Sequence, residues 1–447
     1  MNAPWRIIFG VYRIFSWMRY RVARRFTRAG LVMVVALVVS ATMGADMDST
    51  VAYQAFTLSL ALLLVSAGFG WFFRVRISAT RILPRFGTVS EPFDYMVVVA
   101  NQTSRFQNGL TLMEDLTDTR PRFPEWRAMQ LARQKTVRSF RFGGRTVSNP
   151  FKRATIKEAV VPSLPPNSEA EVRIEITPLR RGVLRYGGLT LARSDPLGLF
   201  RAMARFPLAD AALILPKRYA LPPIALPGVM KYQDGGVALA SSVGQSEEFV
   251  SLRDYRRGDP LRHIHWRSWA KIGKPIVKEF ADEFFVRHAL VLDTFCDDPH
   301  SEAFEEAVSV AASFACTIQT QESLLDLLFV GAEAYCFTAG RGLAHADQML
   351  EVLASVQVCA AKPFETLERL VLNHASSVSG CICVLLAWDA ARRRFVEKLK
   401  SLGVPVLVVV VLSSKPDQPL EPGPMRDEPD RFHTLLLGQI ERGLAKL

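Results

Sequence analysis

Two long apolar stretches dominate the start of the chain. Residues 29–45 carry no charge and are rich in Val, Leu and Ala, and residues 51–73 form a second, longer stretch. Only the short polar segment 46–50 separates them. A helix needs about 20 apolar residues to cross the ~30 Å hydrocarbon core of a bilayer. The pattern predicts a transmembrane helical hairpin over residues 29–73, whose second helix spans comfortably and whose first spans marginally.

The charges beside these stretches predict how the hairpin is oriented. Residues 1–85 hold eleven Arg, no Lys and only two acids, Asp46 and Asp48, which accounts for +9 of the total charge of +12. The arginines flank the open ends of the hairpin and the acids lie in its turn, so the positive-inside rule places the N-terminus and the large C-terminal domains in the cytoplasm. Because the rest of the chain carries only about +3, the pI of 9.6 reflects topology and does not indicate nucleic-acid binding.

The first 28 residues interleave aromatic residues with arginines. This composition suits a helix that lies in the membrane interface and contacts lipids, and a hydrophobic leader to the first span is the alternative. Residues 43–45 also loosely resemble a signal-peptide cleavage site. Against cleavage, the region before them is long and carries seven Arg, and a second span follows at once. We therefore expect a multi-pass membrane protein.

A β-domain is predicted over residues 74–220. Large apolar residues recur at every second position along residues 93–99, and apolar residues alternate with charged ones along residues 170–176, as in half-buried strands. Turn signals containing glycine occur at Asn108-Gly109, Arg181-Gly182 and Gly187-Gly188. We expect a small antiparallel, immunoglobulin-like β-sandwich. Residues 127–153 hold eight Lys or Arg and no acid, which favours either a solvated basic loop or contact with anionic lipid headgroups.

From residue 289 onward the pattern changes to alternating strands and helices. Short apolar segments occur at 289–293, 324–330, 381–387 and 404–412, and helical patterns at 301–320, 344–356, 365–374 and 390–402. Buried strands that alternate with helices predict a mainly parallel sheet covered on both faces. A polar loop at 416–430 and a last helix complete the predicted α/β domain, residues 289–447.

All six cysteines lie in this C-terminal part, which the topology assigns to the reducing cytosol. They form no Cys-x-x-Cys pair and no zinc-like group. We expect them to pack in the core.

Between the two domains, residues 221–288 combine a proline-rich linker with an unusual charged and aromatic segment. Asp259 followed by Pro260 predicts a helix start, and Gly273 predicts its end. The segment therefore indicates a strand at 248–252, a short helix at 260–272 and an extended run after it. The acids and arginines of this segment suggest an ion-pair network that fixes the loop, with an acid/base centre as the alternative.

These residues carry a family resemblance. The motif comprises Glu248-Phe249, Leu252-Arg253, Tyr255, Gly258-Asp259, Arg262, Ile264, Trp266 and Lys278-Glu279-Phe280. In order and spacing it resembles the hallmark of a bacterial domain of unknown function, number 58, and residues 195–200 resemble a second element of that family. His265 replaces the usual Asp before the Trp, and Trp269-Ala270-Lys271 replaces the usual Ala-Arg-Thr. The resemblance implies a protein of the bacterial inner membrane.

The C-terminal part also resembles a von Willebrand factor A-like domain, because two predicted strands end at Asp293 and Asp389. That fold's metal site uses Asp-x-Ser-x-Ser, whereas this chain has Asp293, Phe295 and Asp297. The resemblance leaves a degenerate site in which Asp293, Asp297 and Asp389 hold Mg²⁺ through oxygen and water. The alternative is that Asp293 and Asp389 cap the helices that follow them.

Two classes of function remain. The family resemblance implies a non-enzymatic adaptor or scaffold that acts with a MoxR-type AAA+ ATPase in the maturation, remodelling or stress response of envelope or metal-dependent complexes. Its partner contacts are expected at Glu248, Phe249, Arg253, Tyr255, Gly258, Asp259, Arg262, Trp266 and Glu279. The alternative is a metal-assisted hydrolase at the cytoplasmic face of the membrane that uses Asp293. No phosphate-binding loop, Gly-x-Ser-x-Gly or dinucleotide fingerprint supports an enzyme.

Overall fold

The protein is described by a computed structural model. It describes residues 3–43, 50–70, 73, 75–117, 120–137, 151–222, 249–256, 259, 261–280, 286–317, 323–339, 343–416 and 418–447. The chain divides into two compact units, Met1–Leu215 and Pro216–Leu447. The result is a multidomain protein of mixed α and β structure.

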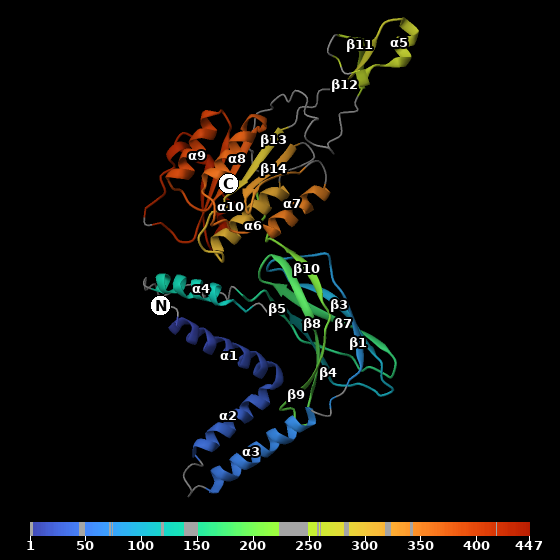
Figure 1. Cartoon of the computed structure of the whole chain (residues 1–447), viewed down its shortest axis with the longest axis vertical. Helices are drawn as coiled ribbons and strands as arrows, with labels where there is room; N and C mark the ends of the chain where they lie inside the picture. The colour runs from blue at the N-terminus through green and yellow to red at the C-terminus, as the bar shows by residue number, and fades with distance from the viewer. Residues whose placement is uncertain are drawn as a thin grey trace. The chain divides into compact units, whose positions relative to one another are not determined.

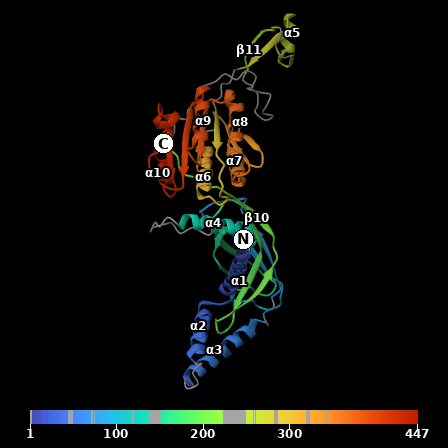
Figure 2. The same ribbon diagram turned by 60° about the vertical axis from the view of Figure 1, so that its left-hand side comes forward.

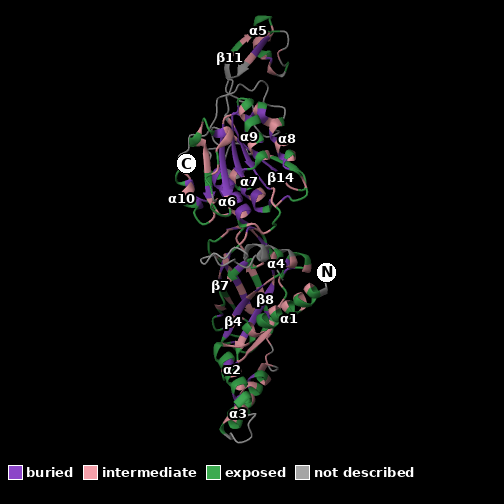
Figure 3. Ribbon diagram, turned by 90° about the vertical axis from the view of Figure 1, so that its left-hand side faces the viewer, coloured by how far each residue is buried: buried purple, intermediate pink, exposed green. Residues whose placement is uncertain are grey.

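Three helices open the first unit: α1 (Ala3–Arg25), α2 (Arg28–Met43) and α3 (Thr50–Phe69). The helices α2 and α3 pack side by side, and both are largely exposed (Figure 1, Figure 3). Within the described residues, one helix is long and apolar enough to cross a membrane, at Val51–Phe69, whereas α2 is apolar but shorter. The two apolar stretches of the sequence are therefore both helical, and α3 fits a membrane span.

A two-layer β-domain forms the rest of the first unit. Its strands are β1 (Ile77–Ile82), β2 (Phe86–Thr88), β3 (Phe93–Asn101), β4 (Leu110–Leu116), β5 (Ala154–Ile156), β6 (Ala159–Val160), β7 (Glu169–Pro178), β8 (Gly182–Ser194), β9 (Arg201–Phe206) and β10 (Asp210–Leu215). One sheet has the order β1-β3-β7-β5, and the other has the order β2-β10-β8-β4-β6 with β9 also paired to β8. Side chains from both sheets share one core. The described pairings are antiparallel except for that of β2 with β10.

The predicted alternation along two strands is confirmed. Tyr95, Val97 and Val99 of β3 point into the core, and β7 buries its own alternating residues in the same way. The turn predicted at Gly187-Gly188 is wrong, because both residues lie inside β8. A Cβ at Gly188 would lie 2.4 Å from the carbonyl oxygen of Phe206, so glycine is needed there because β9 approaches closely.

The helix α4 (Phe123–Val137) packs against α1. Trp126 of α4 is 2% exposed, and its ring lies 5.4 to 6.0 Å from the rings of Trp5, Phe9 and Tyr12. Most of the basic segment predicted at 127–153 lies outside the described residues. The aromatic residues of the N-terminal helix therefore serve, in part, to dock it onto α4.

The second unit contains a six-stranded sheet. Its strands are β13 (Val286–Leu292), β14 (Ser323–Val330), β15 (Ala334–Ala339), β16 (Gly380–Leu385), β17 (Val406–Leu412) and β18 (Phe432–Leu436), in the order β15-β14-β13-β16-β17-β18. The pairings are parallel except that of β15 with β14. The helices are α6 (Glu302–Thr317), α7 (Leu343–Ser355), α8 (Glu365–His374), α9 (Ala390–Ser401) and α10 (Ile440–Leu444). The helices α6 and α7 pack together, as do α8 and α9, and the sheet lies between the two pairs (Figure 1, Figure 2).

The prediction of a mainly parallel sheet is confirmed, with two omissions. The pattern missed β15, an antiparallel edge strand, and β18, which falls where only a loop and a helix were expected. The expectation that every cysteine packs in the core is wrong for Cys316 and Cys336, which are exposed. Cys359, Cys381 and Cys383 are buried as expected.

Candidate functional site

The family motif folds as a small module of its own, which we call the signature module (residues 249–280). The strand β11 (Phe249–Asp254) pairs antiparallel with β12 (Ile276–Phe280), and the 3-10 turn η2 (Leu261–His263) and helix α5 (Trp266–Ile272) connect them. Ile264, Ile276 and Val277 are buried and form its small core. The backbone N–H of His265 donates to the carbonyl of Ile276 at 2.8 Å, which fixes the start of α5 against β12.

A bidentate ion pair closes the loop after β11. Arg253 donates from Nη1 to Asp259 Oδ2 at 2.7 Å and from Nη2 to Oδ1 at 2.9 Å. The backbone N–H of Arg256 also donates to Asp259, at 2.7 Å. The bonds from Arg253 and Arg256 lower the pKa of Asp259 to about 2, so the carboxylate is ionised at neutral pH. The predicted ion pairing of this segment is confirmed for Arg253 and Asp259.

The predicted helix start at Asp259 is wrong. The α-helix begins at Trp266, and His265 occupies the N-cap position without a side-chain cap. The carboxylate of Asp259 is not free to cap a helix, because it already accepts from Arg253 and Arg256. The predicted end is confirmed: Gly273 adopts a left-handed conformation with φ 74°, and its N–H donates to the carbonyl of Trp269.

The outer face of the signature module is apolar and basic. The rings of Trp266 and Trp269 are stacked 5.2 Å apart, and Trp266 is 64% exposed. Leu261 and Ile272 are 68% and 60% exposed on the same short segment. Residues 249–280 hold eight Lys or Arg and three acids. Exposed apolar groups on a module of net positive charge are typical of a surface that binds another molecule.

The remaining predicted contact residues lie along the same module. Phe249 and Glu279 belong to the β11–β12 pairing, Arg262 lies in η2, and the N–H of Tyr255 donates to the carbonyl of Pro275 at 2.9 Å. Glu248 and Gly258 lie outside the described residues. The motif residues that are described are thus close in space as well as in sequence.

A second cluster lies at the ends of the central strands β13 and β16. Asp293 follows β13 and is fully buried, and Arg392 of α9 donates from Nε to Asp293 Oδ2 at 2.6 Å. Arg392 also donates from Nη1 to Asp389 at 2.5 Å. Burial lowers the pKa of the Arg392 guanidinium, but the two carboxylates outweigh this effect and raise the pKa above its ordinary value. Arg392 is therefore a permanent cation between the two aspartates.

This cluster does not suit a divalent cation. Asp293 accepts from the backbone N–H groups of Phe295 and Leu386 at 3.0 Å each, in addition to Arg392, so both of its oxygens have donors. Asp297 is exposed and takes part in none of these bonds. Within the described ranges, no group of three or more His, Cys, Asp or Glu residues is arranged to hold a metal ion. The guanidinium supplies the positive charge that a metal ion would otherwise bring.

The two aspartates differ in their local roles. Asp389 is the N-cap of α9 and accepts from the N–H of Arg392 at 3.0 Å, which confirms the alternative hypothesis for this residue. Asp293 does not cap α6, because that helix begins at Glu302 and its first turn is capped by the Ser301 hydroxyl, which accepts from Phe304 N–H. Asp293, which follows β13, instead accepts hydrogen bonds from Leu386 at the end of β16 and from Arg392 of α9, and so links these three elements.

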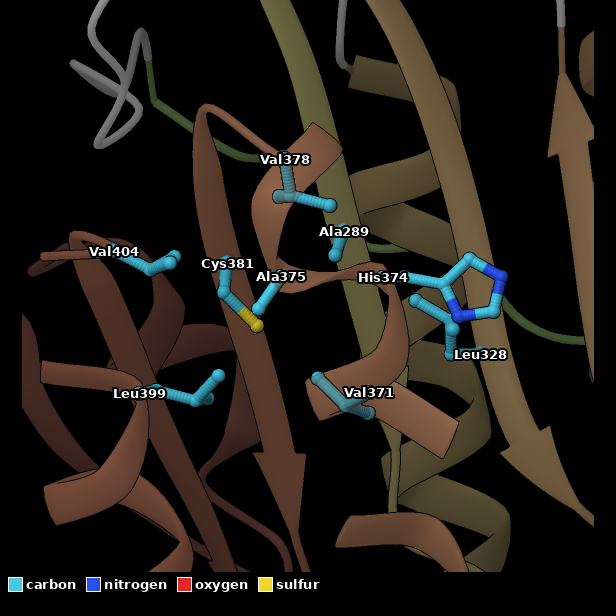
Figure 4. A pocket seen from close by; sticks show the side chains of 9 residues that line it. All are labelled: Ala289, Leu328, Val371, His374, Ala375, Val378, Cys381, Leu399 and Val404. Atoms are coloured by element: carbon cyan, nitrogen blue, oxygen red, sulfur yellow. The ribbon is translucent and has the colours of Figure 1, made fainter. Parts of the chain in front are cut away.

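An apolar pocket under α8 carries no such chemistry. Figure 4 shows it lined mostly by Ala, Val, Leu and Cys side chains, with His374 at one side. It leaves no room for a water molecule. His374 is oriented by its own helix, because its Nδ1 lies 2.8 Å from the carbonyl oxygen of Leu370. This pocket belongs to the core.

The second family element, residues 195–200, holds the helical segment to the β-domain. Asp195 accepts from the N–H groups of Leu197 and Phe200 and so shapes a tight turn. The Leu199 carbonyl in that turn accepts from the N–H of Thr27, between α1 and α2, at 3.2 Å. A Cβ on Gly30 would lie 2.0 Å from the same carbonyl oxygen, so the start of α2 can approach only because residue 30 is glycine.

Comparison with known families matches the signature module and part of the second unit. Residues 251–418 match the family model described as "Protein of unknown function DUF58". This part of the chain belongs to the DUF58 family. The DUF58 match begins in β11 and ends after β17, so it includes most of the signature module and the cluster around Asp293.

The chain is also similar to an uncharacterized protein, YeaD, of Bacillus subtilis (strain 168), with 28% identity over 206 residues. The match covers 45% of this chain and 50% of that protein, so the chain spans about half the length of this curated relative.

Among solved structures, the chain has matches over 31% of its length to a CARDB domain from Pyrococcus furiosus and to a PapD-like domain of human CEP192. The identities are 13% and 9%, and the matches cover 93% and 87% of those chains. Both TM-scores are 0.16.

Proposed function

We propose that this DUF58 protein is a membrane-tethered, non-enzymatic adaptor that presents its signature module to a partner protein. The stacked pair of Trp266, which is exposed, and Trp269, which is half-buried, on a module of net positive charge is the observation that supports it most strongly. Trp and Arg are the residue types most enriched among the energetically dominant residues of protein interfaces. Such a surface fits a partner whose own face is apolar and rimmed by acidic groups.

The ion pairs of Arg392 support a non-enzymatic role. In open sheets with this strand order, ligands bind in the crevice at the carboxyl ends of the central strands. Here that position holds Asp293 paired with Arg392, and both oxygens of the carboxylate already accept hydrogen bonds. We propose that this von Willebrand factor A-like domain is a structural platform rather than a metal-assisted hydrolase.

The helical segment supports a membrane tether. The α3 helix is long and apolar enough to cross a bilayer, and the arginines lie before α2 and after α3. We propose that α2 and α3 form a transmembrane hairpin in the bacterial inner membrane, with the N-terminus and both large domains in the cytoplasm. The β-sandwich, immunoglobulin-like in our proposal, would join this anchor to the DUF58 domain.

The partner that we propose is a MoxR-type AAA+ ATPase, which is the partner that the family resemblance implies. The adaptor would hold the ATPase at the membrane while it matures or remodels envelope or metal-dependent complexes. The surface contacted on the ATPase would be acidic, since the signature module is basic.

Native purification of the full chain from detergent-solubilised membranes, with ATP hydrolysis blocked, tests this proposal. We expect mass spectrometry to recover an AAA+ ATPase with the parent protein and to lose it with a Trp266→Ala, Trp269→Ala double variant. A Leu402→Ala variant is the matched control, because Leu402 is an exposed apolar residue of the same unit, 56% exposed, outside the module.

Three results would contradict the proposal in different ways. Recovery of the ATPase with all variants would place the contact elsewhere on the chain. Recovery of no ATPase with the parent protein would refute the adaptor role. Finding the parent protein in the soluble fraction would refute the membrane tether.

A further inference from the structure

A basic pocket lies between α1 and the β-domain within the first unit, with a volume of ≈ 830 Å³. It is formed by the last turns of α1 and by residues of β4, β5, β8 and β9. Its charged lining consists of Arg21, Arg24, Arg25, Arg120, Arg205, Glu114 and Asp115. This volume lies in the range of sites that hold a small molecule or a headgroup.

Both acids of the pocket are already paired with cations. Glu114 accepts two bonds from Arg81, each 3.0 Å long, and both side chains are buried. Asp115 is 4% exposed; it pairs with Arg24, and Arg205 lies 3.3 Å away. The two carboxylates therefore do not offset the charges of Arg21 and Arg25.

Arg21 and Arg25 supply charge that no acid offsets. Their guanidinium groups lie over aromatic rings, 4.4 Å from the ring centroid of Trp17 and 5.8 Å from that of Phe200. In the part of the chain that the structure describes, neither forms an ion pair with a carboxylate. A planar guanidinium held over a ring keeps its donors available for a bidentate bond to a phosphate group.

The position of these arginines points to the source of the anion. Arg25 is separated from the first residue of α2, Arg28, only by Phe26 and Thr27. The carbonyl of Leu199 accepts from Thr27 and packs against Gly30, so the start of α2 is fixed to the rim of the β-domain. If α2 enters the bilayer at Arg28, Arg21 and Arg25 lie within about 10 Å of that level along the chain, where lipid headgroups are found.

We propose that this pocket binds the phosphate-bearing headgroup of an anionic membrane lipid. The need for an anion follows from the arginines alone, whereas the lipid source rests on the membrane tether proposed above. A bound headgroup would join α1 to β4 and β9 and so hold the β-domain at the membrane surface.

Binding to the full chain in an uncharged detergent tests the pocket without a bilayer. The probes are dihexanoyl-phosphatidylglycerol, its zwitterionic phosphatidylcholine counterpart and inorganic phosphate, each titrated by calorimetry. We expect the anionic lipid to bind most tightly. An Arg21→Gln, Arg25→Gln variant should bind the anionic lipid at least about tenfold more weakly. A loss of about tenfold in affinity is what the removal of one charge-assisted hydrogen bond causes.

The matched control is Arg13→Gln, Arg19→Gln, which removes the same charge from exposed positions of α1 that do not line the pocket. It should bind as the parent does. If the pocket variant fails to fold, a single Arg21→Glu variant at an exposed position gives the same comparison.

The outcomes separate the parts of the proposal. Equal loss in the pocket and control variants, or no binding by the parent, would refute the pocket. Phosphate that binds as tightly as the lipid would show an anion site filled from solution and refute the lipid source. The titrations in detergent do not depend on the membrane tether. Alkaline extraction of membranes therefore tests the tether separately.

Discussion

The bond between Arg392 and Asp293 gives the sharpest test of the proposed platform role. Asp293 is 0% exposed, and the Arg392 side chain is 9% exposed. An Arg392→Met variant keeps much of the length of the side chain and removes the donors to Asp293 and Asp389. Asp293 would then be a buried carboxylate that accepts only two backbone N–H groups.

Removing one partner of a buried ion pair typically costs about 3–5 kcal/mol. For a domain of this size, 1 kcal/mol shifts the melting temperature by about 2–4 °C. We therefore expect the unfolding transition of the second unit to fall by roughly 6–20 °C. Circular dichroism or scanning calorimetry on the full chain in detergent measures this shift.

Two companion variants make the result specific. Asp293→Asn in the Arg392→Met background removes the unpaired charge and should recover part of the loss. Arg394→Met, an exposed arginine of the same helix, should change the free energy of unfolding by no more than about 0.5 kcal/mol.

Melting temperatures measured with added Mg²⁺ can refute this reasoning. We expect Mg²⁺ to leave the melting temperature of the parent unchanged, because Arg392 already pairs with both aspartates. A rise in the parent that is lost in an Asp293→Ala, Asp389→Ala variant would show a working metal site and refute this reasoning. An Arg392→Met variant as stable as the parent would refute the energetic argument.

Three further predictions concern the signature module and the membrane segment. Arg253 and Arg256 lower the pKa of Asp259 to about 2. The stabilisation from this carboxylate should therefore be complete above about pH 4 and lost as the pH falls through about 2. A carboxyl NMR titration that places the pKa of Asp259 near 4 would contradict this prediction. Gly30→Ala should loosen the attachment of α2 to the β-domain and speed proteolysis between them, whereas Gly10→Ala, with no neighbour within 4 Å, should not. The full chain should remain in the membrane pellet after alkaline carbonate extraction, and its release would contradict the tether.

Much of the fold could be predicted from the sequence where one local pattern determines it. The alternation along β3 and β7 specified strands with one face in the core, and both were found. The helix expected at 365–374 has those bounds in α8, and Gly273 ends α5 as its conformational freedom predicts. These elements need no information from distant parts of the chain.

Other features depend on contacts that a local pattern does not encode. The antiparallel edge strand β15 and the short strand β18 are recognisable only by their pairing with β14 and β17. Gly187-Gly188 has the composition of a turn, but the close approach of β9 explains the second glycine.

The candidate site was predicted in part. The signature module was located by its motif, but the exposure of Trp266 follows from the packing of Ile264 against β12. No local pattern predicts that Arg392 pairs with Asp293, 99 positions away. Its one local signal was the spacing of Asp389 and Arg392 across the first turn of α9.

Photocrosslinking in living cells tests the adaptor role most directly. The photoreactive residue p-benzoylphenylalanine would replace Trp266, and in a matched strain Leu402, while ATP hydrolysis by the partner is blocked. We expect a crosslink to an AAA+ ATPase from position 266 and none from position 402. A crosslink to the ATPase from both positions or from neither, in correctly folded membrane-bound protein, would contradict the assignment of the signature module as the partner contact.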